Sequence, residues 1–267
     1  MYFKVRLADL VIGVECLYET TRMFCKDYVS EDIPVDFEVK ITDEDIRVER
    51  KISDDTERKK ENDENVQILD SEIWKDENHY RNKYLETLAL LRKIAKYLPE
   101  YDCFLMHGAV VSANDYGYMF TAPSGTGKST HINLWKQYFD DIEIINGDKP
   151  FIRVLEDKVW AYGTPWCGKE GWQKNASVPL KGICLLNRGR ENHIAQITPV
   201  QALPFIMRQV HYTDDSEMAG KTLELLNRLM TEVKLYRLEC DVSREAAKCS
   251  YEGMVGGMEE DGKSAEF

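Results

Sequence analysis

The segment Ser124-Gly-Thr-Gly-Lys-Ser-Thr130 contains the residue types that hold the phosphates of a nucleotide. Small residues let successive backbone N–H groups curl around a phosphate chain, and the N-terminus of a following helix adds a favourable field. In this pattern the lysine ammonium reaches the β- and γ-phosphates, and the next hydroxyl binds Mg²⁺. The candidate phosphate-binding residues are therefore Ser124, Gly125, Thr126, Gly127, Lys128, Ser129 and Thr130.

The residues around this segment argue against an ordinary Gly/Ser turn. Residues 110–111 and 118–120 are typical of short strands joined by a hairpin turn over 114–117. After the segment, apolar residues recur at helical spacing at Ile132, Leu134, Trp135, Tyr138 and Phe139. Strand, loop and helix is the context that a phosphate-binding loop requires. The first glycine of the usual pattern is Ala122 here, whose small side chain we expect to permit the turn.

Two residues distant in sequence are candidates to complete the site. His107 lies on a strand predicted over 104–111, and hairpin pairing should place it near the loop, although a histidine on a strand is more often a satisfied core residue. Asp148 follows a strand predicted over 142–146, where phosphate-transfer enzymes hold a metal-binding carboxylate. An Asx turn is the alternative for Asp148. The prediction is that His107 and Asp148 meet beside the loop, near the γ-phosphate.

Together, Phe104-Leu-Met-His-Gly-Ala-Val110, the hairpin, the loop and the strand ending at Asp148 resemble the HPr kinase/phosphorylase and ATP-dependent phosphoenolpyruvate carboxykinase superfamily. The segments 162–168 and 175–188 resemble its smaller HPr-kinase-like members, so the resemblance covers residues 104–209. It implies an α/β fold, in which a P-loop domain with a mixed sheet follows a smaller, mainly β N-terminal lobe. It also implies ATP and Mg²⁺ as cofactors. His107, Asp148 and Lys128 would be catalytic, and Ser129 and Asp148 would bind the metal.

One position departs from that family pattern. Two adjacent acids usually end this strand, whereas Gly147 precedes Asp148 here. A single carboxylate predicts weak Mg²⁺ binding in the absence of nucleotide, because such sites gain affinity with ligand charge. We expect Gly147→Asp to tighten metal binding if the new side chain can face the site.

One further segment and two single residues could have a functional or a structural role. The segment 164–169 is either a substrate loop with Lys169 on a phosphate or a turn with Trp166 filling the edge of the core. Arg188 either neutralises charge in the transition state or is an exposed arginine at a strand end, which is the commoner outcome. Cys167 is not favoured as a nucleophile, because no histidine lies near it in sequence.

Composition excludes several functional classes. The chain has 267 residues, 43% of them hydrophobic, and a net charge of −12, which argues against nucleic-acid binding through a general positive field. It contains no apolar run long enough to span a bilayer, and residues 1–9 do not have the pattern of a signal peptide. Seven cysteines without a CxxC pair predict reduced thiols in a cytoplasmic protein.

The remaining elements must position the site. Alternation predicts strands over 2–7, 35–41 and 46–50, and the polar run 53–65 predicts a solvated hairpin loop. A helix is predicted over 76–98, ending before Pro99. Further strands are predicted over 118–121, 151–155, 159–162, 182–187 and 193–197, and helices over 128–139, 199–210, 215–232 and 243–252. Many strands joined by short turns favour a mixed sheet over βαβ alternation. The predicted domains are 1–100, for substrate or partner recognition, and 101–255, with a frayed tail over 256–267.

These features favour an ATP- and Mg²⁺-dependent kinase that transfers the γ-phosphate to a hydroxyl, with a serine of a peptide or small protein as the acceptor. A non-catalytic nucleotide-binding sensor, a small-molecule kinase or carboxykinase-like enzyme, and a phosphorylase running the reverse reaction are the alternatives. The expected partners are the nucleotide and the phosphoacceptor, without nucleic acid or a membrane span. The sequence leaves the formation of a homo-oligomer open.

Overall fold

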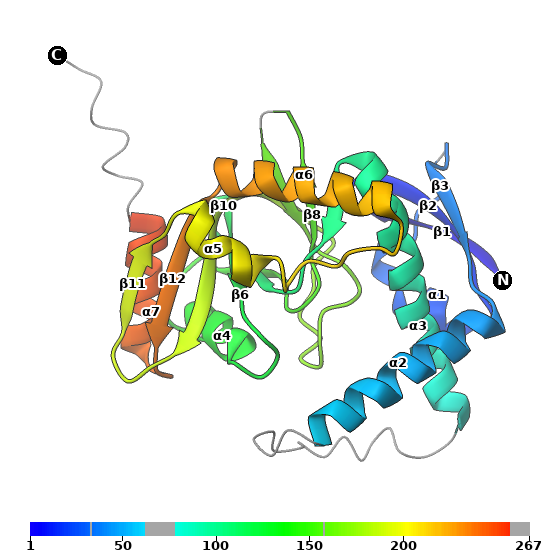
Figure 1. The fold of residues 1–267 in the computed structure, drawn as a ribbon, viewed down its shortest axis with the longest axis horizontal. Helices are drawn as coiled ribbons and strands as arrows, with labels where there is room; N and C mark the ends of the chain where they lie inside the picture. Colours follow the sequence, from blue (N-terminus) through cyan, green and yellow to red (C-terminus); the bar gives the residue numbers. More distant parts are fainter. Residues whose placement is uncertain (33, 62–77, 157, 257–267) are drawn as a thin grey trace. The chain divides into compact units, whose positions relative to one another are not determined.

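The computed structural model describes residues 1–32, 34–61, 78–156 and 158–256 (Figure 1). The chain divides into two compact units, Met1–Ile94 and Ala95–Phe267, called here the N-terminal and C-terminal units. Of the tail predicted over 256–267, residues 257–267 lie outside the described residues. No described helix has the length and apolar character needed to cross a membrane.

The N-terminal unit contains a small three-stranded sheet. Strands β1 (Tyr2–Leu7) and β2 (Leu10–Glu15) form an antiparallel hairpin, and β3 (Phe37–Lys40) lies parallel to β2. Both turn residues, Ala8 and Asp9, have positive φ angles of 51° and 61°, as a tight two-residue hairpin requires. The helical elements are α1 (Glu19–Phe24), η1 (Lys26–Tyr28), α2 (Asp43–Glu61) and most of α3 (Asn78–Tyr97). The strands predicted over 2–7 and 35–41 are confirmed, and β2 was not predicted.

Helix α2 corrects two predictions. Residues 46–50 are helical, not a strand, and residues 53–61 continue that helix instead of forming a loop; 62–65 lie outside the described residues. The Thr42 hydroxyl and the Asp45 carboxylate cap the helix reciprocally, and acidic residues fill its first turn. Ile46 and Glu49 are buried on one face, and Glu49 forms an ion pair with Arg92 of α3. The helical period therefore overrides the short alternation.

The C-terminal unit is built on a nine-stranded mixed sheet. Its strands are β4 (Cys103–Leu105), β5 (Ala109–Ala113), β6 (Tyr116–Thr121), β7 (Glu143–Asn146), β8 (Phe151–Val154), β9 (Val159–Tyr162), β10 (Ser177–Arg188), β11 (His193–Gln196) and β12 (Lys234–Cys240). The order is β4-β8-β9-β10-β6-β5-β7, with β12 on β10 and β11 on β12. The first part of β10 pairs antiparallel with β9, and its second part lies parallel to β6 and β12, so one strand joins both parts of the curled sheet.

Most predicted strands of this unit are confirmed to within a few residues, except that β10 begins earlier and β12 was not predicted. The strand predicted over 104–111 is wrong, because it divides into β4 and β5. Strand β4 pairs with β8, whereas β5 pairs with β6 and β7, so residues 106–108 cross from one partner to another. His107 therefore lies in a link between strands.

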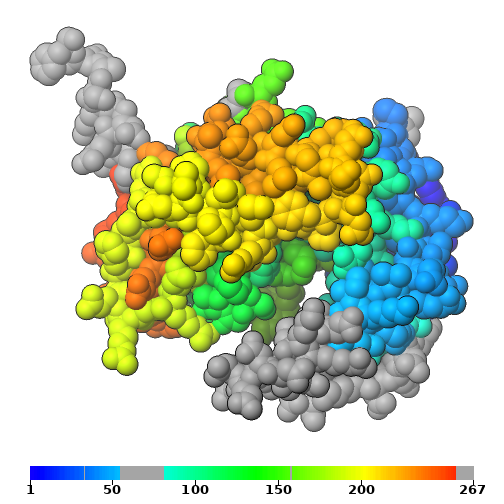
Figure 2. Space-filling model, in the orientation of Figure 1, coloured from blue at the N-terminus to red at the C-terminus, as the bar shows by residue number. Residues whose placement is uncertain are grey.

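Helices cover both faces of this sheet. They are α4 (Lys128–Tyr138), α5 (Pro199–Ile206), α6 (Ser216–Glu232) and α7 (Arg244–Tyr251), as predicted, together with η3 (Leu98–Tyr101) and η4 (Glu252–Gly256). Alternate residues of the central strands enter different cores: Val110 and Met119 pack with α5 and α6, whereas Val111 and Phe120 pack with α4 and α7. Helices α5 and α6 form the yellow-to-orange surface in Figure 2.

All seven cysteines are free thiols, and six of them are buried. They pack as small apolar groups, as the scattered spacing predicted.

Candidate functional site

The first four candidate phosphate-binding residues, from Ser124 to Gly127, belong to a loop over 122–127, called here the glycine-rich loop, which joins β6 to α4. Gly125 and Gly127 have φ angles of 79° and 119°. Nothing lies within 4 Å of a Cβ added at either position, so backbone conformation, not space, requires glycine there. Ser124 and Gly125 are exposed, so the loop is open to a ligand.

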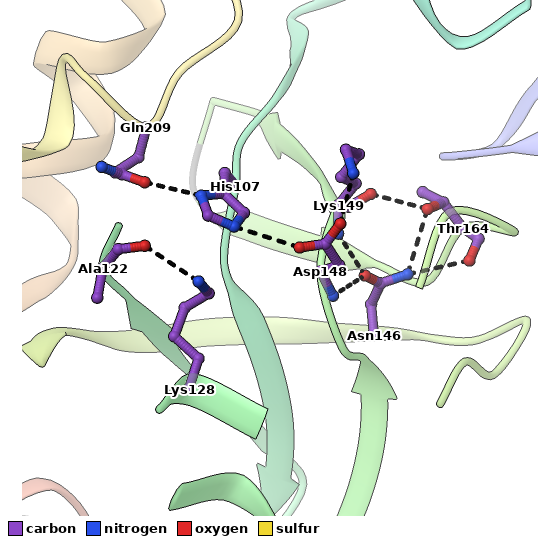
Figure 3. A network of polar contacts seen from close by, with 8 residues as sticks. All are labelled: His107, Ala122, Lys128, Asn146, Asp148, Lys149, Thr164 and Gln209. Atoms are coloured by element: carbon purple, nitrogen blue, oxygen red, sulfur yellow. Dashed lines mark hydrogen bonds and ion pairs between the residues drawn. The ribbon is translucent and has the colours of Figure 1, made fainter. Parts of the chain in front are cut away.

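Lys128 begins α4, and its side chain folds back beneath the glycine-rich loop. Its ammonium donates a hydrogen bond of 3.0 Å to the backbone oxygen of Ala122 (Figure 3). Only 7% of the residue is exposed. Burial lowers its pKa, and attraction to Asp148 partly opposes this effect. A buried ammonium with one neutral acceptor gains from a further anionic partner.

Ser129 and Thr130 follow on the first turn of α4. Ser129 is partly buried and Thr130 is exposed. Both come soon after the loop, and the buried Lys128 lies between the loop and these two residues.

His107 and Asp148 lie in direct contact. The two residues come from separate links, one between β4 and β5 and the other after β7, and His107 Nε2 lies 3.2 Å from Asp148 Oδ1. The Thr121 hydroxyl, at the root of the glycine-rich loop, donates to the backbone oxygen of His107 at 2.7 Å. Tertiary structure thus brings His107 and Asp148 together next to the root of the loop, whereas their position near a γ-phosphate stays a prediction.

Asp148 is a stable carboxylate. Burial opposes its ionisation, but the hydrogen bond from His107 and the charge of Lys149 outweigh this effect and lower its pKa to about 2. The Lys149 ammonium forms an ion pair with Asp148 Oδ2. Asp148 therefore carries a full negative charge at neutral pH.

Gln209 is a site residue that the sequence did not indicate. Its side-chain oxygen lies 2.8 Å from His107 Nδ1, and its backbone oxygen accepts from the His107 N–H at 2.7 Å. His107 is thereby held between Gln209 and Asp148 (Figure 3). Gln209 lies between α5 and α6, and only the pairing of that segment with the β4–β5 link reveals the contact.

Asn146 builds the turn that carries Asp148. Its side-chain oxygen accepts from the N–H groups of Asp148 and Lys149 at 2.9 and 2.8 Å. Its amide nitrogen donates to the backbone oxygen of Thr164 at 3.0 Å, and the Thr164 hydroxyl donates to the Lys149 oxygen at 2.7 Å. Both Asn146 and Thr164 are fully buried. An Asx turn does exist at this strand end, and it orients the acid.

Gly147 cannot carry a second acid in this structure. A Cβ added there would lie 2.7 Å from the backbone oxygen of Cys167 and 3.4 Å from that of Trp172. The Gly147 N–H also donates to the Trp172 oxygen at 2.9 Å, so the segment after Cys167 is fixed against it. The condition on which Gly147→Asp was expected to tighten metal binding is therefore not met by this backbone, because a side chain there would point into the 167–172 segment.

Arg188, at the end of β10, contacts the glycine-rich loop. Its guanidinium donates to the backbone oxygens of Thr126 at 3.0 Å and Gly125 at 2.5 Å. These carbonyls lie in the segment whose N–H groups would face a phosphate. Arg188 thus stabilises the loop conformation, a role that the sequence did not indicate.

The segment 164–169 has a structural role at Trp166. Trp166 is 4% exposed, and its indole ring stacks on Phe151 with ring centroids 6.3 Å apart. The backbone oxygen of Trp166 accepts from the Lys149 N–H at 3.1 Å. Lys169 is exposed. Burial raises the pKa of the Cys167 thiol, which does not favour a nucleophile.

Within the described parts of the chain, no three or more His, Cys, Asp or Glu side chains are grouped to hold a metal ion. A fully protein-held metal centre is therefore not formed by these residues. The Asp148 carboxylate and the Ser129 hydroxyl are oxygen ligands of the kind that Mg²⁺ takes, since this ion is commonly held by one or two carboxylates together with substrate phosphates.

No protein-family model and no curated protein matches the sequence. Among solved structures, the chain is similar to the Hpr(Ser) kinase/phosphatase from Coxiella burnetii. The two are 9% identical, the similarity covers 61% of this chain and 99% of that chain, and the TM-score is 0.33. This weak likeness establishes neither a family nor an activity for this chain.

Proposed function

We propose that this protein is an ATP- and Mg²⁺-dependent kinase that transfers the γ-phosphate to a hydroxyl, with a serine of a peptide or small protein as the acceptor. The observation that carries the proposal is the meeting of the glycine-rich loop and its buried Lys128 with the His107–Asp148 pair at the root of that loop. The P-loop assignment and the HPr-kinase-like character of the fold belong to the same proposal.

In this proposal the N–H groups of the glycine-rich loop and Lys128 bind the phosphates. A triphosphate would supply a directly bonded anionic partner to the Lys128 ammonium, which donates to the neutral backbone oxygen of Ala122. Ser129 and Asp148 would hold Mg²⁺, which neutralises charge on the phosphates when it is bound.

Asp148 suits the role of metal ligand better than that of general base. A general base works best when its pKa lies near the working pH, and the pKa of Asp148 is about 2. His107 would keep the carboxylate ionised and oriented, with Gln209 holding the ring on its other side. Catalysis would then consist mainly of positioning and charge neutralisation.

Lys128→Ala tests the proposal. We expect the affinity for Mg-ATP, measured by titration calorimetry, to fall at least tenfold, roughly the effect of losing one charge-assisted hydrogen bond. Lys136→Ala is the control, because Lys136 lies exposed near the other end of α4. Equal ATP affinity in the parent and Lys128→Ala would contradict the assignment of the loop.

A nucleotide-binding sensor is the second candidate, and the single acid beside Gly147 favours it. The fate of γ-labelled ATP separates the two functions. Label on an added peptide library, lost in Asp148→Asn, supports the kinase. Retention of intact ATP under conditions of saturating binding, with no label on peptide, amino acid or water, supports the sensor.

A further inference from the structure

A pocket of about 340 Å³ opens beside the glycine-rich loop, within the C-terminal unit. Thr126, Gly127 and Thr130 form the part of its wall that belongs to the loop and the first turn of α4. The pocket therefore begins where the proposed phosphate site ends. It lies away from the turn that carries Asp148, whose residues do not line it.

The position of the pocket follows from the sheet. Strand β10 lies between β6 and β12, and all three run parallel. Strand β6 leads into the glycine-rich loop, whereas β10 ends at Arg188 and β12 at Cys240, which are paired in register. The pocket lies at these carboxyl ends. In α/β sheets, ligands bind in the crevice outside the carboxyl ends of parallel strands.

The lining of the pocket combines apolar surface with a few polar groups. Leu134, Leu186 and Val242 supply the apolar part, and Asn187 and Asp241 supply hydrogen-bonding groups. Val242 is 73% exposed, so its apolar surface is open to a ligand. Ligand pockets of this size typically carry such a mixture, in which apolar contacts supply affinity and a few polar groups fix orientation.

Arg188 connects the pocket to the loop. It lines the pocket, and its guanidinium is bonded to the backbone oxygens of Gly125 and Thr126. A ligand in the pocket and a phosphate on the loop would thus share a wall. A molecule with a flat, partly apolar part joined to a phosphate chain fits both surfaces at once.

We propose that this pocket binds the adenine and ribose of the nucleotide whose phosphates lie on the glycine-rich loop. The base covers Leu134, Leu186 and Val242, and Asn187 and Asp241 bond to its polar edge or to the ribose hydroxyls. This inference rests on the proposed function, since it places the remainder of the same ligand.

The test compares two Mg²⁺-loaded probes, ATP and inorganic triphosphate, by titration calorimetry. The parent should bind ATP more tightly, because only ATP has a nucleoside. The double variant Leu134→Gln/Val242→Gln introduces no charge. It should lower the affinity for ATP roughly tenfold and leave the affinity for triphosphate unchanged. Val200→Gln is the matched control, because Val200 is an exposed valine of α5.

The outcomes separate this inference from the proposed function. Equal affinity of the parent for both probes, or a double variant that weakens both equally or neither, overturns the nucleoside pocket. If Lys128→Ala loses affinity for both ATP and triphosphate, phosphate binding by the glycine-rich loop is supported independently of the pocket. If Lys128→Ala keeps its affinity for both, the proposed function is overturned. Photo-crosslinking of the unmodified protein with an azido-ATP should label residues 186–189 or 240–242. Labelling elsewhere overturns the inference even where the double variant fails to fold.

Discussion

At the scale of single residues, Asn146 determines the direction of Asp148. Its buried amide binds two consecutive N–H groups on one side and Thr164 on the other. Asp148 and Lys149 therefore leave the strand end side by side. The acid is recognisable in the sequence, whereas the residue that orients it has no distinguishing pattern.

Gly147 gives the first prediction at this scale. Gly147→Ala should lower the free energy of unfolding by about 1–3 kcal/mol, because its methyl group would meet the Cys167 backbone. Gly147→Asp should destabilise the protein further and should not tighten Mn²⁺ binding. Thermal unfolding and paramagnetic titration measure the two effects.

Gly220→Ala is the matched control for that substitution. Gly220 lies inside α6, and an added Cβ meets nothing within 4 Å. The change should stabilise the protein by about 0.5–1 kcal/mol, since alanine favours a helix over glycine. A Gly147→Ala variant as stable as the parent would show that the 167–172 segment can move away.

Gln209 gives the second prediction. Gln209→Leu removes the partner of His107 Nδ1, so the ring should lose its fixed orientation. Long-range ¹H–¹⁵N spectra of ¹⁵N-histidine protein should show changed ring-nitrogen signals for His107, assigned with His107→Asn. Gln137→Leu, on the exposed face of α4, should leave them unchanged. Phosphate transfer should fall in Gln209→Leu while ATP affinity stays at the parent value, a combination that a general loss of folding would not produce.

At the scale of elements, helix α1 is held by a residue from another helix. No side chain of its own N-cap residue caps it. The fully buried Glu86 of α3 accepts from the N–H groups of Leu17 at 2.5 Å and Tyr18 at 3.1 Å, and from the Thr21 hydroxyl. One carboxylate thus joins the start of α1 to α3.

The third prediction concerns this carboxylate. Glu86→Ala removes the acceptor of three donors, one of them the buried Thr21 hydroxyl, and should lower the free energy of unfolding by about 2–4 kcal/mol. Glu86→Gln keeps one side-chain oxygen and should be intermediate. Urea unfolding measures both variants, and a loss below about 1 kcal/mol in Glu86→Ala would indicate that solvent replaces the carboxylate.

The sequence predicted those elements in which one periodic signal dominates. Strands β6 to β9 and helices α4 to α7 have short apolar runs or clear helical spacing between turn residues. Prediction from the sequence was wrong where a change of strand partner or a helix cap determines the structure. The strand is interrupted at 106–108 because β4 and β5 have different partners, and α2 begins where Thr42 and Asp45 cap it. Gln209 reaches the site only through tertiary contacts, so no local pattern marks it. Arg188 was a candidate from the sequence, but its hydrogen bonds to the glycine-rich loop follow only from the tertiary structure.

At the scale of the whole molecule, a buried histidine links stability to pH. His131 is 3% exposed, and burial lowers its pKa from 6.5 to about 4. Ser250 donates its hydroxyl hydrogen to Ala247 and accepts from Trp135, so it also acts as acceptor for His131 Nε2. The neutral ring fits this cluster, and an imidazolium would be buried without a counter-charge.

The fourth prediction follows from this depressed pKa. As pH falls, the His131 side chain of the unfolded chain is protonated before that of the folded protein, which favours unfolding. The free energy of unfolding should therefore be unaffected by His131 above pH 6.5 and should fall by about 3 kcal/mol as pH falls towards 4. Asp148 affects the free energy of unfolding at lower pH. Its stabilising contribution is complete above its unfolded pKa near 3.8 and is lost as pH falls towards 2. Unfolding free energies across this pH range measure both effects.

Two variants test which residue is responsible for the pH dependence in each of these two pH ranges. His131→Gln should flatten the slope between pH 6.5 and 4, whereas Asp148→Asn should leave that slope and flatten the one below pH 4. An unchanged upper slope in His131→Gln would place the responsible proton on another group.

The close approach at Gly147 also constrains how this chain can evolve. A descendant with an acid at 147 must first acquire a shifted or shortened 167–172 segment, because a Cβ has no room while that backbone stays in place. The two changes are therefore epistatic, and their order is fixed. Lineages that keep the segment should retain glycine at 147, and those that carry an acid there should differ in this segment as well.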